Sequence, residues 1–196
     1  MGTELLPEHI REYYEVHEWK HACAILQQDF QNEWNDIIAV LENFKLCKTW
    51  IVTGGGGKSG ISKSIDVFLS ERGWIEKKFE TYVKVDDVIM ESPTHKIDCY
   101  KNRIALEIEW NNKDPFYDRD LNNFRLLFDL RTISVGIIIT RADHLQDIFD
   151  KIGRGASYGA STTHMSKLLT RIKGGSGGGC PILVFGITNK LYDENC

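Results

Sequence analysis

Two short β-rich runs, residues 97–100 and 103–110, flank a polar dipeptide and constrain the fold more than any other stretch. Residues 101–102, Lys-Asn, fit a two-residue turn, so the runs are predicted to pair as an antiparallel hairpin with Asp98 opposite Ala105. Because side chains alternate along a strand, we expect Asp98, Ala105, Glu107 and Glu109 on one face. The opposite face is apolar and is therefore expected to be a core face.

Three carboxylates close together on one face repel each other, and packing gains nothing from them. A divalent cation would resolve the conflict, and hard cations such as Mg²⁺ prefer oxygen ligands. The residues alone thus make Asp98 and Glu107 candidate ligands for one or two Mg²⁺ ions, helped by the backbone carbonyl near Ile108. Glu109 is expected to bind a second metal or to position the attacking water.

The composition of the 196-residue chain is that of an ordinary globular protein, with 42% hydrophobic and 27% charged residues. We expect one domain, with no membrane-spanning run of about 20 apolar residues and no secretory signal at the N-terminus. The five cysteines are scattered and form no CxxC pair. They are predicted to be reduced thiols in a cytoplasm, and neither a zinc site nor a disulfide framework.

Basic residues are segregated, although the net charge is −4. Residues 44–65 and 151–180 hold nine lysines and arginines between them and contain no acid. This distribution predicts a basic cleft on an acidic protein, with chance clustering in solvated loops as the alternative. The residues expected to contact DNA from these two segments are Lys58, Ser59, Arg154, Ser157 and Thr162, and Ser161 and His164 are weaker candidates.

Residues 50–60 imitate a nucleotide-binding P-loop, because an expected strand and a Gly-rich loop precede Lys58-Ser59 and a predicted helix. The P-loop motif requires a glycine where this chain has Val52. We therefore expect no nucleotide cofactor and keep a P-loop NTPase only as a third hypothesis. A Gly-rich, acid-free loop is still suited to gripping a phosphate backbone through its N–H groups and Lys58.

Hydrophobic periodicity predicts an α/β fold: a central mixed β-sheet flanked by helices. Helices are expected over 7–18, 22–44, 61–72, 116–131, 142–152 and 165–172, and strands near 50–52, over 74–85, 134–140 and 181–187. Residues 1–60 are interpreted as a helical N-terminal part with the Gly-rich DNA-contacting loop, and 61–196 as the catalytic core. His17 and His21 share a face of the first predicted helix, as a metal pair or, more simply, as packing residues. Glu80 is either an extra acid near the site or a surface residue.

Asp98 followed by Glu107-Ile108-Glu109 resembles the PD-(D/E)xK nuclease motif in its BamHI-like E-x-E variant. The blocks 105–114, 116–121, 134–141 and 158–164 resemble the BglII/BstYI-type restriction endonucleases, and the resemblance runs from about residue 70 to 190. It departs from the general motif at Ile97, which replaces a proline, and at Glu109, which replaces a lysine. With no lysine to orient the nucleophile, the general base is left open between Glu109, a metal-bound water and a substrate phosphate oxygen.

This resemblance implies a type II restriction endonuclease of a prokaryotic cytoplasm that cuts a short palindrome in double-stranded DNA with Mg²⁺. It implies that Asp98 and Glu107 bind the metal, and that the chain is a homodimer, for which helix 116–131 is the candidate contact. Asn112 is expected to reach a base edge, since an amide pairs with adenine in two hydrogen bonds; alternatively, it only shapes a turn. The competing function is a non-catalytic DNA-binding module on the same fold.

Overall fold

A six-stranded mixed sheet forms the centre of the protein, whose computed structural model describes residues 2–53, 57–91 and 94–196. The strands follow the order β1-β9-β8-β7-β6-β3. β7, β8 and β9 run parallel, whereas β1, β6 and β3 are antiparallel to their neighbours. Their bounds are β1 (Tyr14–Trp19), β3 (Ile75–Lys77), β6 (Ile97–Lys101), β7 (Ile104–Ile108), β8 (Val135–Arg141) and β9 (Ile182–Ile187).

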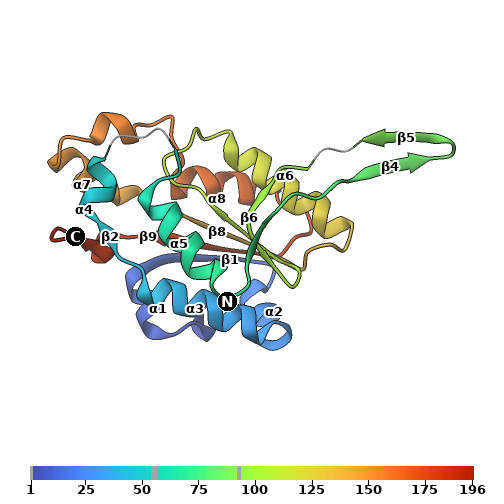
Figure 1. Ribbon diagram of the computed structural model, residues 1–196, viewed down its shortest axis with the longest axis horizontal. Helices are drawn as coiled ribbons and strands as arrows, with labels where there is room; N and C mark the ends of the chain where they lie inside the picture. Colours follow the sequence, from blue (N-terminus) through green and yellow to red (C-terminus); the bar gives the residue numbers. More distant parts are fainter. Residues whose placement is uncertain (1, 54–56, 92–93) are drawn as a thin grey trace.

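Helices cover both faces of this sheet, which confirms the predicted α/β class. Figure 1 shows α6 and α8 on one side and α1 to α3 on the other. The α-helices are α1 (Glu8–Tyr13), α2 (Ala22–Asp29), α3 (Gln31–Asn43), α4 (Lys48–Val52), α5 (Gly60–Ser70), α6 (Phe116–Asp129), α7 (Gln146–Lys151) and α8 (Met165–Lys173). Short 3₁₀ helices span Gly2–Leu5, Asp143–Leu145, Gly155–Tyr158 and Asn189–Leu191. No helix in the described ranges is long and apolar enough to cross a membrane.

Two hydrophobic clusters, one on each side of the sheet, make the core. β8 serves both, because Ile137 and Ile139 belong to the larger cluster while Ile138 belongs to the cluster under α6 and α8. Every residue of β8 is buried, as its nearly all-apolar sequence predicts for a strand covered on both faces.

The β6–β7 hairpin forms as predicted, but its register differs. Cys99 pairs with Leu106 and Tyr100 with Ala105, so the turn is Asn102-Arg103 and continuing the register sets Asp98 opposite Glu107, not Ala105. Both turn residues have positive φ, 42° and 69°, and asparagine tolerates that conformation better than Lys101 does. Ala105 also packs in the cluster under α6, so the acidic face of the hairpin is covered at this position, whereas Asp98 on the same face stays half-buried.

Five predictions about the N-terminal half and residues 74–85 are wrong in detail. The first helix ends at Tyr13, and residues 14–19 become β1, an edge strand rich in aromatic and branched residues. His17 therefore lies on a strand and His21 precedes α2, so they do not share a helical face. The predicted helix 22–44 breaks at Phe30, and the strand expected near Trp50 is part of α4. Residues 74–85 split into β3 and β4.

Cys47 and Cys196 form a disulfide, with their Cα atoms 4.9 Å apart, so the prediction of five reduced thiols is wrong for this pair. The cause is local pairing: β2 (Leu46–Cys47) runs parallel to β10 (Tyr192–Asp193) and brings the C-terminus to the start of α4. Cys23, Cys99 and Cys180 are free and buried.

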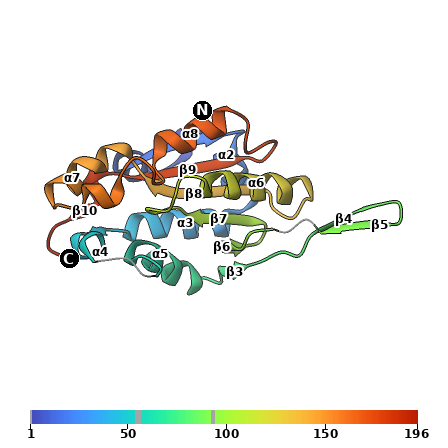
Figure 2. The same ribbon diagram turned by 90° about the horizontal axis from the view of Figure 1, so that it is seen from above.

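A second hairpin, β4 (Tyr82–Val85) with β5 (Val88–Glu91), extends away from the body of the molecule (Figures 1 and 2). It pairs only within itself, as a separate two-stranded sheet. Several of its apolar side chains are exposed, including Tyr82, Val88 and Ile89.

Candidate functional site

Asp98 of β6 and Glu107 of β7 lie side by side and are tied to each other's strands. The Ile108 backbone N–H donates to Asp98 Oδ2 at 3.0 Å, and the Asp98 N–H donates to Glu107 Oε2 at 3.3 Å. Asp98 is half-buried, whereas Glu107 is buried behind it. The hairpin thus holds two carboxylates close together with one of them facing outward.

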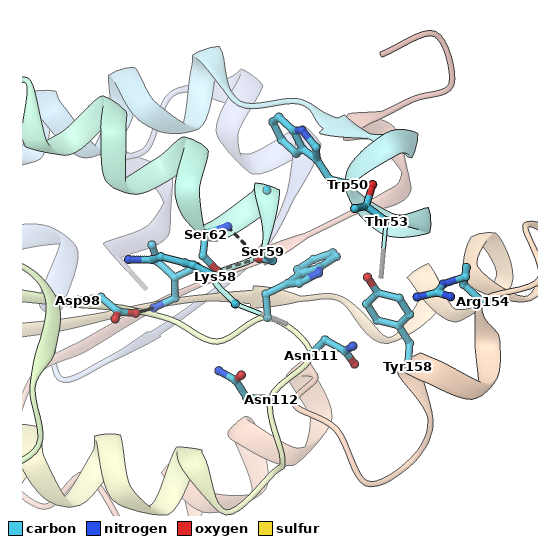
Figure 3. A pocket seen from close by; sticks show the side chains of 14 residues that line it. Trp50, Thr53, Lys58, Ser59, Ser62, Asp98, Asn111, Asn112, Arg154 and Tyr158 are labelled. Atoms are coloured by element: carbon cyan, nitrogen blue, oxygen red, sulfur yellow. Dashed lines mark hydrogen bonds between the residues drawn. The ribbon is translucent and has the colours of Figure 1, made fainter. Parts of the chain in front are cut away.

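Asp98 faces a cleft of about 440 Å³ that collects residues from distant parts of the sequence (Figure 3). Lys58 and Ser59 come from the start of α5, Asn112 from the segment after β7, and Arg154 from the loop after α7. The remaining lining residues are Trp50, Thr53, Gly57, Gly60, Ser62, Ile108, Trp110, Asn111 and Tyr158. One carboxylate and two cations from both acid-free segments therefore share one cavity.

The α5 side of the cleft is organised by Ser59, whose hydroxyl accepts the Ser62 N–H at 3.1 Å and caps the helix. Lys58 forms an ion pair with Asp66, eight residues further along the chain, and still lines the cleft. Residues 54–56 of the Gly-rich loop lie outside the described residues. The predicted binding of a phosphate backbone by the N–H groups of this loop stays a prediction there.

The opposite side is built by pairing residues 112–114 with residues 161–163. Thr163 N–H donates to the Asn112 carbonyl at 2.8 Å, and Asp114 N–H donates to the Ser161 carbonyl at 3.1 Å. Ser157 is exposed, and Thr162 donates to the Gly159 carbonyl while accepting from Arg141. Neither Ser157 nor Thr162 lines the cleft, whereas Arg154 does. Glu80 is exposed and also lies outside the lining.

Glu109 is buried and does not line the cleft, although it follows Glu107 on the same strand face. Its Oε2 accepts from Asn112 Nδ2 at 2.9 Å, and its Oε1 lies 3.3 Å from Arg119 Nη2. Burial, and next the charge of Asp120, raise the pKa of Glu109 to about 9. At neutral pH this carboxyl group is therefore largely protonated in the metal-free protein.

Asp120 of α6 is a member of the site that sequence reasoning missed. It is fully buried, and after burial itself its charge is the largest cause that raises the pKa of Glu107, ahead of Asp98. The sequence does carry a signal, because an aspartate one residue before Leu121 falls on the apolar stripe of a predicted helix. A charge on such a stripe is rarely buried without a partner.

The two hairpin carboxylates fit a divalent cation. Glu107 Oε1 is buried and has no hydrogen-bond partner within the described part of the chain. Mg²⁺ binds through one or two carboxylates and fills its other positions with water and substrate oxygens. Among residues 2–53, 57–91 and 94–196, no group of three or more His, Cys, Asp or Glu side chains is arranged to hold a metal ion. The protein ligands available are thus the Asp98 and Glu107 carboxylates, and the Ile108 carbonyl stays a predicted third ligand.

Comparison with known proteins identifies the family. No curated protein matches the chain. The family model described as restriction endonuclease BglII/BglIII matches residues 14–187, from the first residue of β1 to the last of β9. The match covers most of the chain and includes the hairpin, α6 and both sides of the cleft. The chain therefore belongs to the BglII/BglIII family of restriction endonucleases, enzymes that cut DNA.

Proposed function

We propose that this protein is a type II restriction endonuclease that hydrolyses phosphodiester bonds at a short palindromic site in double-stranded DNA. The proposal includes Mg²⁺ as cofactor, a homodimer as the active form, and a single nuclease domain. The observation that carries it is the meeting of Asp98 with Lys58 and Arg154 in one cleft, beside Glu107. Carboxylates that bind a cation and basic groups that bind phosphate are the two requirements of metal-assisted phosphodiester hydrolysis.

Asp98 and Glu107 are the proposed metal ligands. When bound, Mg²⁺ supplies Lewis-acid stabilisation of the phosphate and a more acidic water. The reciprocal hydrogen bonds between the two strands hold both carboxylates before the ion arrives, so little ordering is needed on binding. Glu109 completes the proposed catalytic set from behind the cleft wall, where it contacts Asn112.

Lys58, Ser59 and Arg154 are proposed to bind the DNA backbone from the two sides of the cleft, with Ser157 and Thr162 extending this contact beyond it. Asn112 is proposed to contact a base edge, since it lines the same cleft as Asp98 (Figure 3). Two copies of this arrangement, related by a two-fold axis, match the symmetry of a palindrome. Helix α6 supports the dimer, because Phe116 and Leu130 are exposed at its two ends.

The test is incubation of the protein with plasmid DNA in Mg²⁺, with EDTA as the control. We expect discrete fragments with Mg²⁺, none with EDTA, and fragment ends that map to one palindromic sequence. Binding without cleavage over a broad range of conditions would favour the non-catalytic module. A continuous smear of products would refute site specificity while leaving nuclease activity in place.

A binding experiment tests the basic side of the cleft. Lys58→Ala should weaken binding to all duplexes alike and lower the slope of log affinity against log salt by about 1. Lys63→Ala is the matched control, because Lys63 is exposed on the same helix and does not line the cleft. A change of sequence preference without a change of slope would contradict the role given to Lys58.

A further inference from the structure

Arg119 of α6 joins two buried carboxyl groups. Its Nη2 atom lies 3.3 Å from Glu109 Oε1 and 2.7 Å from Asp120 Oδ1, and its Nε donates to the same Asp120 oxygen at 2.8 Å. The guanidinium also stacks over the Phe116 ring, with its carbon 4.3 Å from the ring centre. Arg119 is therefore held in one orientation by its anchor, Asp120, and by Phe116.

The charges around Arg119 show why its position matters. Glu107, Glu109 and Asp120 are all buried, and in the described part of the chain the ion pairs of Glu109 and Asp120 are both made with Arg119. Removing the one cation that faces a buried carboxylate leaves the carboxylate uncompensated, so it moves or recruits water. About a third of the Arg119 side chain is exposed, so solvent can fill its place without collapse of the core.

Asn112 connects the group formed by Arg119, Asp120 and Glu109 to the cleft. Glu109 Oε2 accepts from Asn112 Nδ2 at 2.9 Å, while the Asn112 backbone is fixed by Thr163 on both sides, through its N–H at 3.2 Å and its carbonyl at 2.8 Å. The proton of Glu109 is engaged in its side-chain hydrogen bond with Asp120, so Oε2 is left as an acceptor. An acceptor oxygen pairs with the amide nitrogen and not with the amide oxygen, so Glu109 selects one of the two amide orientations. Asn112 lines the cleft and Glu109 does not, so the selected orientation is what DNA meets.

We infer that Arg119 is a positioning residue: anchored by Asp120, it fixes Glu109, and through Glu109 it fixes the amide of Asn112 toward DNA in the cleft. The inference rests on the proposed function, because the oriented amide needs a base edge to recognise. Arg119 itself does not touch the DNA. Its loss therefore relaxes discrimination at one base pair of each half-site, an effect that DNA binding without metal reads separately from any effect on the metal ligands Asp98 and Glu107.

The experiment is a double-mutant cycle between Arg119 and Asn112, read as DNA binding in EDTA by fluorescence anisotropy. Two duplexes are compared, one with the mapped cleavage site and one with a single base pair of that site replaced. Arg119→Ala should lower the affinity ratio of the two duplexes by about tenfold. This loss lies within the range expected when one amide–base contact is lost. In an Asn112→Ala background the same substitution should change the ratio no further.

Conservative and control variants separate positioning from general destabilisation. Arg119→Lys keeps the positive charge. Its affinity ratio for the two duplexes should lie between those of Arg119→Ala and the wild type. Arg125→Ala, at an exposed arginine of the same helix, should leave the ratio unchanged. If Arg119→Ala does not fold, Arg119→Lys and Glu109→Gln are taken through the same cycle and should lower the ratio only when Asn112 is present.

Two results would overturn the inference: an unchanged ratio in the folded Arg119 variants, or an equal loss with and without Asn112. The proposed function fails differently, through a wild-type protein that cuts no DNA in Mg²⁺. A wild type that cuts, together with an Arg119→Ala variant that discriminates normally, refutes the positioning role alone.

Discussion

The two hairpins of this protein use similar backbone geometry in opposite environments. β6–β7 lies inside the six-stranded sheet, and every residue of β7 is buried. β4–β5 extends from the body, and Ile89 at its centre is 63% exposed. Both turns contain residues with positive φ, Asn102 and Arg103 in the first and Asp86 in the second.

The difference shows that neighbours, and not the hairpin itself, give the acids their chemistry. An isolated two-stranded hairpin is at best marginally stable in water, and its carboxylates stay solvated. In β6–β7 the same residue type is confined between β8 and α6, so Glu107 and Glu109 lose water and have raised pKa values. If the neighbours set this difference, substitutions in β6–β7 should change function and stability, and matched substitutions in β4–β5 should not.

The largest effect is expected from the acid that faces the cleft. Asp98→Asn should slow DNA cleavage by roughly 100-fold or more, because a metal ion supplies several kcal/mol of transition-state stabilisation. Asp87→Asn, in the turn of the exposed hairpin, is the matched control and should cut at the wild-type rate. Equal losses in both variants, measured by single-turnover cleavage, would remove the functional distinction between the hairpins.

Truncation of one apolar side chain in each hairpin compares their packing. Leu106→Ala should cost about 2–5 kcal/mol of unfolding free energy, because Leu106 is fully buried between β6 and β8. Ile89→Ala should change it by less than about 0.5 kcal/mol. Urea unfolding measures both, and a cost above about 1 kcal/mol for Ile89→Ala would mean that the exposed hairpin is buried in solution.

The buried acids also predict how stability depends on pH. The folded pKa of Glu109 is raised from 4.5 to about 9, so between these values the folded state holds a proton that the unfolded state releases. The metal-free protein should therefore lose stability as pH rises through this window, by an amount on the order of a few kcal/mol. Glu109→Gln, which cannot ionise, should flatten that decline in thermal unfolding with EDTA. If the stability of the wild type and of the variant depended on pH in the same way, the buried, ionisable state of Glu109 would be contradicted.

The smallest effect concerns the turn of the packed hairpin. Arg103 has φ of 69°, a conformation that glycine adopts without steric cost. Arg103→Gly creates the favoured Asn-Gly turn and should raise the unfolding free energy by roughly 0.5 kcal/mol. Asp86→Gly should alter global stability less, because its hairpin does not pair with the main sheet. A destabilised Arg103→Gly protein would contradict the turn assignment.

The sequence predicts which side chains come together better than it predicts the strand pairing around them. Alternation along the strands places Asp98, Glu107 and Glu109 on one face, and charge segregation identifies the segments of Lys58 and Arg154 that line the cleft. The turn itself was misplaced by one residue, because Lys101-Asn102 and Asn102-Arg103 are both polar and only the backbone conformation distinguishes them.

The features that were missed depend on tertiary contact. In the sequence, Asp120 is only a polar residue within an amphipathic helix. In the folded protein its charge acts on Glu107 and Glu109 and raises their pKa values. The disulfide joins cysteines 149 residues apart in the sequence, brought together by the pairing of β2 with β10. The periodicity of residues 14–18 predicts helix, whereas β1 forms because its edge position beside β9 is set by the sheet.

The most direct test of the account is single-turnover cleavage of DNA by Glu107→Gln in Mg²⁺, with binding to the same DNA measured in parallel. Glu107 lies behind Asp98, which faces the cleft, and carries a buried oxygen without a hydrogen-bond partner in the described chain. We predict that the variant binds DNA with near wild-type affinity and yields no fragments. Cleavage at the wild-type rate would show that the acids of the β6–β7 hairpin are not the cutting centre.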